Sequence, residues 1–157
     1  MSDRLRRELR QARGFGSLEE ATFLSLQRTA GIWMQTLATK LRPSNLTPTQ
    51  YNVLRILRGA HPSALTCGEI GERMVTAVPD VTRLADRLAA RRLAWKARDE
   101  HDRRIVRVEI SGQGLELLES LDVKVLGWID DILSPLSKEE TEALCGLTEK
   151  ARGSQGE

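Results

Sequence analysis

Apolar residues between positions 78 and 90 recur with the period of an α-helix. Val81, Leu84, Ala85 and Leu88 fall at i, i+3, i+4 and i+7, so they form one stripe along a helix. The polar and charged residues between them lie on the other faces. The pattern predicts an amphipathic helix with one packed face and one free face.

The next stretch has the pattern of a β-hairpin. Residues 105–110 alternate with a period of two, which places Val106, Val108 and Ile110 on one face of a strand. A shorter apolar run, 93–97, precedes them, and the polar segment 99–104 lies between the two runs. We therefore expect a hairpin whose tip carries charge.

Helix start signals mark the rest of the chain. A Ser or Thr followed three residues later by Glu or Gln forms a capping box. The chain has such pairs at Ser17/Glu20, Thr47/Gln50, Thr66/Glu69 and Ser137/Glu140. They predict helices from 17 to about 40, from 48 to about 59, from 67 to about 74 and from 138 onward. Ser111 and Pro135 bound one further long helix.

These elements predict a mainly α fold with a small β-wing. Two short helices joined by a tight turn, with the second one basic, form a helix-turn-helix, and the hairpin makes it winged. The long helices carry more apolar surface than one small winged domain covers, and a closed two-fold dimer buries it. We expect a basic N-terminal arm over 1–16, which could form a helix; a frayed, solvated end is the favoured interpretation, and contact with a phosphate backbone is the alternative. A dimerisation helix at 17–42, the winged helix-turn-helix at 43–111 and C-terminal dimerisation helices at 112–157 follow.

The charge distribution is polarised along the chain. The whole sequence holds 24 Lys and Arg against 22 Asp and Glu, but residues 78–107 hold nine against five and residues 111–157 hold four against ten. A basic helix beside a basic hairpin suits a polyanion such as double-stranded DNA. The alternative is that the charges only solvate an ordinary surface.

Other function classes have little support. No apolar run approaches the roughly 20 residues that span a bilayer, and the first residues lack a signal-peptide core, so we expect a cytoplasmic protein without membrane contact. Two cysteines and two histidines indicate reduced thiols, no structural metal and no cofactor. The sequence lacks a phosphate loop and a nucleophile elbow, so we do not expect an enzyme.

At this point the residues resemble a known family. Residues 102–114 resemble the wing signature of the MarR (multiple antibiotic resistance regulator) family, D-x-R-x-x-x-V-x-L-T-x-x-G, with matches at Asp102, Arg104, Val108 and Gly114. Residues 46–54 resemble the opening of the family's winged domain, and residues 81–88 its recognition helix. The resemblance implies a homodimeric transcription regulator, expected to be a repressor that reads a pseudo-palindromic operator and is released by a small-molecule effector.

The resemblance also implies which residues contact DNA. The expected contacts are Thr82, Arg83 and Arg87 on the groove-facing helix, and Asp102, Arg103 and Arg104 on the wing. Arg104 is the expected minor-groove arginine, and Asp102 the acid that orients it.

The chain departs from the family's pattern at two places. Pro79-Asp80 stands where relatives often have Ser or Thr, and Arg92 replaces a common glycine. We place Pro79 in the first helical turn. We read Asp80 as a favourable charge at a helix N-terminus, with readout of a cytosine amino group as the alternative.

Two hypotheses concern the signal to which such a regulator responds. Family members often bind a small aromatic or phenolic effector, and the side chains that could line its site are Trp33, Tyr51, His61 and Trp128. Plain packing in the core or an interface is the favoured interpretation of all four. Cys67, as the first residue of a helix, could be a redox switch, although a small buried thiol is the favoured interpretation.

Two weaker alternatives remain open. A metal sensor could be built from His61, Cys67, Glu69 and His101, but their spacing matches no dedicated zinc motif. A winged helix can also serve as a protein-interaction module. Such a module has no need for a basic hairpin beside a second basic helix.

Overall fold

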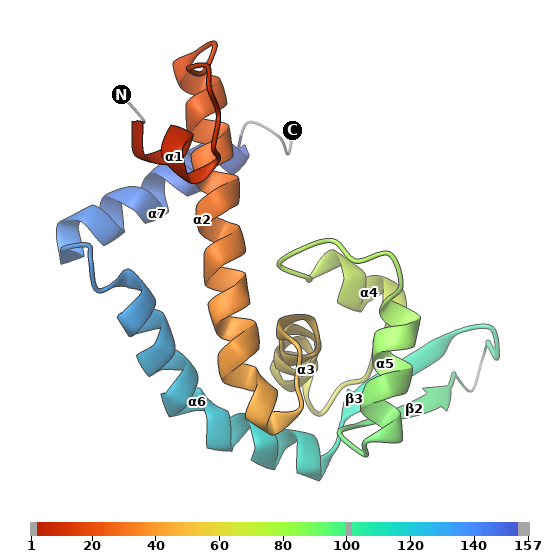
Figure 1. Ribbon diagram of the computed structural model, residues 1–157. Helices are drawn as coiled ribbons and strands as arrows, with labels where there is room; N and C mark the ends of the chain where they lie inside the picture. The colour runs from red at the N-terminus through yellow and green to blue at the C-terminus, as the bar shows by residue number, and fades with distance from the viewer. Residues whose placement is uncertain (1–2, 100–101, 154–157) are drawn as a thin grey trace. The chain divides into compact units, whose positions relative to one another are not determined.

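The computed structural model describes residues 3–99 and 102–153, which form helices and one small sheet (Figure 1). Two compact units divide the chain, Met1–Pro48 and Thr49–Glu157. The predicted fold class, mainly helical with a small β-wing, is confirmed. None of the described helices combines the length and the apolarity that crossing a membrane requires.

The first unit contains α1 (Asp3–Glu8), α2 (Leu18–Leu41) and the 3₁₀ helix η1 (Arg42–Ser44). Ser17 caps α2, because its hydroxyl oxygen accepts from the Glu20 amide at 3.2 Å. A capping box would pair the Glu20 carboxylate with the Ser17 amide. In the structure this carboxylate accepts from the Gly16 amide instead, at 2.6 Å. Leu5 of α1 is buried, so the expected frayed end is wrong for Asp3–Glu8.

Helix α3 (Pro48–Ala60) starts at the last residue of the first unit and otherwise belongs to the second. It is followed by β1 (Leu65–Thr66), α4 (Cys67–Glu72) and α5 (Val81–Ala90). The hairpin strands β2 (Ala94–Arg98) and β3 (Val106–Ile110) come next, and α6 (Gly112–Leu133) and α7 (Lys138–Gly153) end the chain. The three strands form an antiparallel sheet in the order β1-β3-β2. Strand β1 was not predicted, because two residues are too few to show alternation.

The core of the second unit is aliphatic. Its largest fully buried side chains come from α3, α4, α5, β3 and α6, and they are Val53, Leu54, Leu57, Ile70, Leu88, Val108, Leu118 and Leu121. Figure 1 shows α5 beside the β2-β3 hairpin, with α6 continuing from the end of β3. Burial of aliphatic surface therefore fixes α5 on the sheet.

Two polar contacts tie further segments to α3. The Arg58 guanidinium donates two hydrogen bonds to the Asp122 carboxylate of α6, at 2.8 and 3.0 Å. This pairing lowers the pKa of Asp122 below its usual value. The Asn52 side-chain oxygen accepts from the Val75 amide at 3.0 Å, which holds the turn between α4 and α5.

Candidate nucleic-acid interface

Helix α5 presents the predicted charged face to solvent. Ala85 and Leu88 are buried, as the apolar stripe predicted. Thr82, Arg83 and Arg87 are exposed. The three predicted helix contacts therefore share the open side of α5.

Asp80 is the N-cap of α5. Its carboxylate accepts a hydrogen bond from the Arg83 amide at 2.8 Å, which satisfies one of the unpaired amides at the helix start. The interpretation of Asp80 as a helix-terminus charge is confirmed. Pro79 precedes the N-cap, so its expected place in the first helical turn is wrong.

The residues after the end of α5 form a turn that leads into the first wing strand. The Arg92 amide donates to the Ala89 carbonyl and the Leu93 amide to the Leu88 carbonyl, which is the bonding pattern of a Schellman motif. Arg92 has φ of 58°, a left-handed conformation that glycine adopts most readily. Arg92 thus occupies a turn position that favours glycine, and the chain still enters β2 two residues later.

The base of the wing is closed by Ser111 and Gly114. The Ser111 hydroxyl donates to the Arg92 carbonyl at 2.6 Å and accepts from the Gly114 amide at 3.0 Å. A β-carbon on Gly114 would lie 2.2 Å from the Leu93 carbonyl oxygen. Only glycine fits there, which gives the last residue of the wing signature a steric reason.

The wing follows the predicted pattern along both strands. Residue pairs run from Ala94 opposite Ile110 to Arg98 opposite Val106. Val108 and Ile110 are buried on the inner face. Arg103 and Arg104 lie in the exposed turn at the tip, where the sequence placed them.

Asp102 acts on the backbone of the wing tip. Its carboxylate accepts from the Arg104 amide at 2.9 Å, and its carbonyl accepts from the Ile105 amide. Asp102 therefore shapes the turn that carries Arg104, and its effect on the direction of that arginine stays a prediction.

Asp99 is a second organiser of the tip that the sequence did not reveal. One of its carboxylate oxygens accepts from the Asp102 amide at 3.2 Å and the other from Nε of Arg107 at 2.5 Å. The hydrogen bond that Arg107 donates to Asp99 raises the pKa of Arg107. Arg107 is thus committed to a contact within the hairpin.

A further ion pair joins the wing to α5. The ammonium of Lys96 on β2 contacts the carboxylate of Asp86 on α5. The two residues are ten positions apart, so sequence spacing alone does not predict the contact.

These contacts leave an electropositive surface. Asp80 and Asp102 accept from backbone amides, and Asp86 and Asp99 are paired with cations. The uncommitted groups are guanidiniums, since no ion pair within residues 3–99 and 102–153 engages Arg83, Arg87, Arg103 or Arg104. Such a surface attracts a polyanion.

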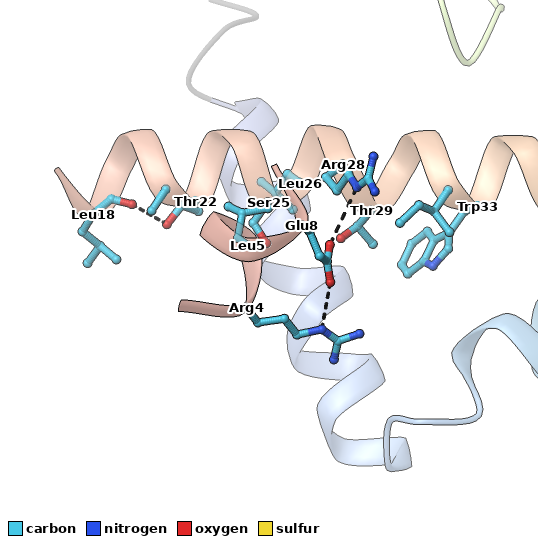
Figure 2. A pocket seen from close by; sticks show the side chains of 12 residues that line it. Arg4, Leu5, Glu8, Leu18, Thr22, Ser25, Leu26, Arg28, Thr29 and Trp33 are labelled. Carbon is cyan, nitrogen blue, oxygen red and sulfur yellow. Dashed lines mark hydrogen bonds and ion pairs between the residues drawn. The ribbon is translucent and has the colours of Figure 1, made fainter. Parts of the chain in front are cut away.

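The four candidate effector residues have different surroundings. Trp33 lines a hollow of about 690 Å³ on the first unit, between α1 and one face of α2. Figure 2 shows Glu8 at this hollow, bridging Arg4 and Arg28. The other three candidates do not line this hollow.

The remaining candidates lie in the second unit. Tyr51 is buried, burial raises the pKa of its hydroxyl, and the Arg55 guanidinium lies 6.0 Å from its ring centre. His61 Nδ1 is 3.5 Å from the Glu109 carboxylate, and Trp128 is half-buried.

The residues proposed for redox or metal chemistry are also placed. Cys67 is half-buried at the first position of α4, after the N-cap Thr66. Glu69 completes this capping box, and its hydrogen bonds from Thr66 lower the pKa of Glu69. His101 lies outside the described residues. Among those described, no cluster of three potential metal ligands occurs.

Comparison with known proteins gives a consistent result. A sequence profile of the MarR family matches residues 44–105. A MarR transcription factor from Planctomyces limnophilus, known from a crystal structure, is 34% identical; the match covers 87% of this chain and 98% of that one, with a TM-score of 0.69. The regulator MhqR of Bacillus subtilis is 30% identical over 97 residues, which is 62% of this chain and 66% of MhqR, just under two thirds.

A further solved structure shares the fold at lower identity. It is a mutant of MarR from E. coli complexed with operator DNA, 21% identical, covering 80% of this chain and 89% of that one, with a TM-score of 0.72. The chain belongs to the MarR family of winged helix-turn-helix, DNA-binding transcriptional regulators.

Proposed function

We propose that α5 and the wing form one duplex-binding surface. Arg83, Arg87 and Thr82 face the major groove, and Arg104 with Arg103 enters the minor groove at the wing tip. The observation that carries this assignment concerns the described residues: Asp86 and Asp99 are paired with cations, Asp80 and Asp102 accept from backbone amides, and no ion pair among these residues engages the four arginines. Arginine favours the negative potential of a narrow minor groove.

We further propose that two copies bind one pseudo-palindromic operator. Large apolar side chains on α2, α6 and α7 are exposed in the single chain, among them Phe23, Leu126 and Leu147. A second copy would bury them, and the hollow beside Trp33 on the first unit offers a seat for part of that copy. Two-fold symmetry then sets the half-sites about one helical turn, roughly 10 bp, apart.

Repression and release by a small aromatic or phenolic effector complete the proposal. Trp33, Tyr51, His61 and Trp128 stay the candidate lining residues. Exposed or half-buried ring surface on Trp33, His61 and Trp128 supports ligand contact, whereas the burial of Tyr51 supports a packing role. Quenching of tryptophan fluorescence by a panel of phenols and aromatic acids tests effector binding, with loss in Trp33→Phe or Trp128→Phe locating the site.

The DNA assignment is tested by selection and salt titration. Wild-type protein is incubated with a fluorescent random-duplex pool, the retained DNA is sequenced, and affinity is measured across salt concentrations. We expect Arg104→Ala to weaken binding to all sequences and to reduce the salt slope by about one unit. Arg83→Ala should also relax sequence preference, because base contacts specify and phosphate contacts position.

Arg152→Ala is the matched control, because it removes an exposed arginine from α7. If Arg83→Ala and Arg104→Ala both bind like this control, the groove assignments are wrong. Wild-type protein that retains no duplex would favour the protein-interaction module.

A further inference from the structure

Lys96 occupies an unusual position in the sheet. It lies opposite the fully buried Val108, on the same face of β2 as the buried Ala94. The neighbouring Trp95 points to the other face and is 61% exposed. Alternation along β2 therefore places a lysine where an apolar residue is expected.

The Lys96 side chain reaches from β2 to α5. Only 20% of it is exposed, and its ammonium contacts the carboxylate of Asp86. A buried aliphatic stem with its charged head at the surface is a common use of lysine. Here the head meets one particular carboxylate.

Asp86 lies on the surface assigned to DNA. It follows Arg83 by three residues and Thr82 by four, so the three side chains share one face of α5. The Asp86 side chain is 60% exposed. An uncompensated carboxylate at this position would repel phosphate.

We propose that Lys96 is a positioning residue for DNA binding that acts only through Asp86. It neutralises the one carboxylate on the open face of α5 beyond its N-cap, and it fixes that face against the wing strand. Lys96 does not contact DNA itself. The inference rests on the proposed assignment of α5 to the duplex, and it adds a determinant that the wing signature and the recognition helix do not contain.

The consequence is a specific dependence. Without Lys96, Asp86 places a bare negative charge on the binding surface, so affinity falls. Without Asp86, Lys96 has no carboxylate to hold away from phosphate, so its loss removes only the weaker, longer-range attraction of one cation and has a smaller effect. A direct phosphate contact by Lys96 would instead weaken binding equally whether Asp86 is present or absent.

A double-mutant cycle on the full chain measures this dependence. The variants are Lys96→Met, which keeps the apolar stem, Asp86→Asn, and the two combined. Their affinity for a random-sequence 30-bp fluorescent duplex is measured by anisotropy at low salt. We expect Lys96→Met to bind about tenfold more weakly, which corresponds to one unscreened charge close to phosphates. Asp86→Asn alone and the double variant should agree within about threefold, because a residue that acts through Asp86 is strongly coupled to it in the cycle.

Lys138→Met is the matched control. It removes the same charge from an exposed pair with Glu142 on α7, and we expect a change of less than about twofold, since α7 is not part of the proposed DNA surface. Lys96→Arg should bind like wild type. Lys96→Gln replaces Lys96→Met in the cycle if the methionine variant does not unfold cooperatively.

Thermal unfolding of each variant separates positioning from simple stabilisation. Equal losses of affinity from Lys96→Met in both backgrounds would overturn the inference, as would affinities that track melting temperature alone. The proposed DNA surface is tested independently by Arg83→Ala and Arg104→Ala. If these two lose binding while the cycle is additive, only the role of Lys96 is refuted; if they bind like wild type, the surface itself is refuted.

Discussion

Helices α5 and α6 are both amphipathic, but they differ in what their second face requires. On α5 the apolar stripe is buried, and the opposite face carries arginines. On α6 one apolar stripe is buried, through Leu118, Leu121 and Val125, and further apolar side chains at 123, 126 and 129 are exposed.

The difference indicates two kinds of partner. The free face of α5 has its acids paired and its guanidiniums available, which suits a polyanion. The free face of α6 offers aliphatic side chains at three-residue spacing, which suits another apolar helix surface. We therefore propose that one chain carries a face for DNA and a face for a second copy of itself.

The largest expected effect comes from placing a charge on the exposed apolar face of α6. Leu126→Glu should convert the proposed dimer to monomer, because an unpaired carboxylate buried in an apolar interface costs roughly 3 kcal/mol or more. Size-exclusion chromatography with light scattering measures the mass. The 30-bp duplex affinity should fall with it, since two linked binding surfaces act together.

Lys124→Glu is the control for this substitution. Lys124 is two residues earlier, on the opposite side of α6, and is exposed. It should leave the mass unchanged. A Leu126→Glu protein with the mass of wild type would mean that this face of α6 is not the interface.

A smaller effect is expected at the base of the wing, where α6 packs closely against the residues before β2 within one chain. Gly114→Ala should lower the free energy of unfolding by about 2–4 kcal/mol, because its β-carbon would overlap the Leu93 carbonyl. At Gly112, on the same helix, a β-carbon would have no atom within 4 Å. Gly112→Ala should therefore leave the free energy of unfolding unchanged or raise it by up to about 1 kcal/mol. Urea unfolding measures both, and equal values would contradict the close approach at Gly114.

Much of this arrangement could be predicted from the sequence, because its determinants are local. The capping signals at Thr66 and Ser111 start α4 and α6 as expected. The apolar stripe of α5 and the alternation of β3 placed the exposed arginines correctly. The exposed apolar surface of the long helices was expected from their length and pattern, and it is present on α2 and α6.

Contacts between elements were missed because they depend on register and tertiary approach. The pairs Lys96–Asp86 and Arg107–Asp99 join positions that no helix or strand period relates. The spacing indicated a contact between Asp102 and Arg104, and the structure shows that this contact is made by the Arg104 amide, an atom that spacing alone does not single out. The motif residues were therefore predictable from the sequence. The ion pairs that neutralise the acids near them were not.

The smallest expected effect concerns the covered side of α6, where Asp122 meets Arg58 of α3. Hydrogen bonding from Arg58 lowers the pKa of Asp122 below 3.8, so the folded state favours the carboxylate. Its contribution to stability is then present above about pH 4 and is lost as the pH falls through the lowered pKa. Because the Asp122 side chain is 42% exposed, solvent screening limits the contribution to about 1 kcal/mol or less.

Asp122→Asn should therefore be less stable than wild type at pH 7, with the difference shrinking toward zero below pH 3.8. Urea unfolding across pH measures this, with Asp130→Asn, an exposed carboxylate on the same helix, as the control that should show little difference at any pH. A difference that persists unchanged in acid would mean that the α3–α6 joint depends on packing rather than on charge. In that case the covered side of α6 would be held by the same apolar forces that we assign to its open side, and the contrast between its two faces would lie only in which chain supplies the partner.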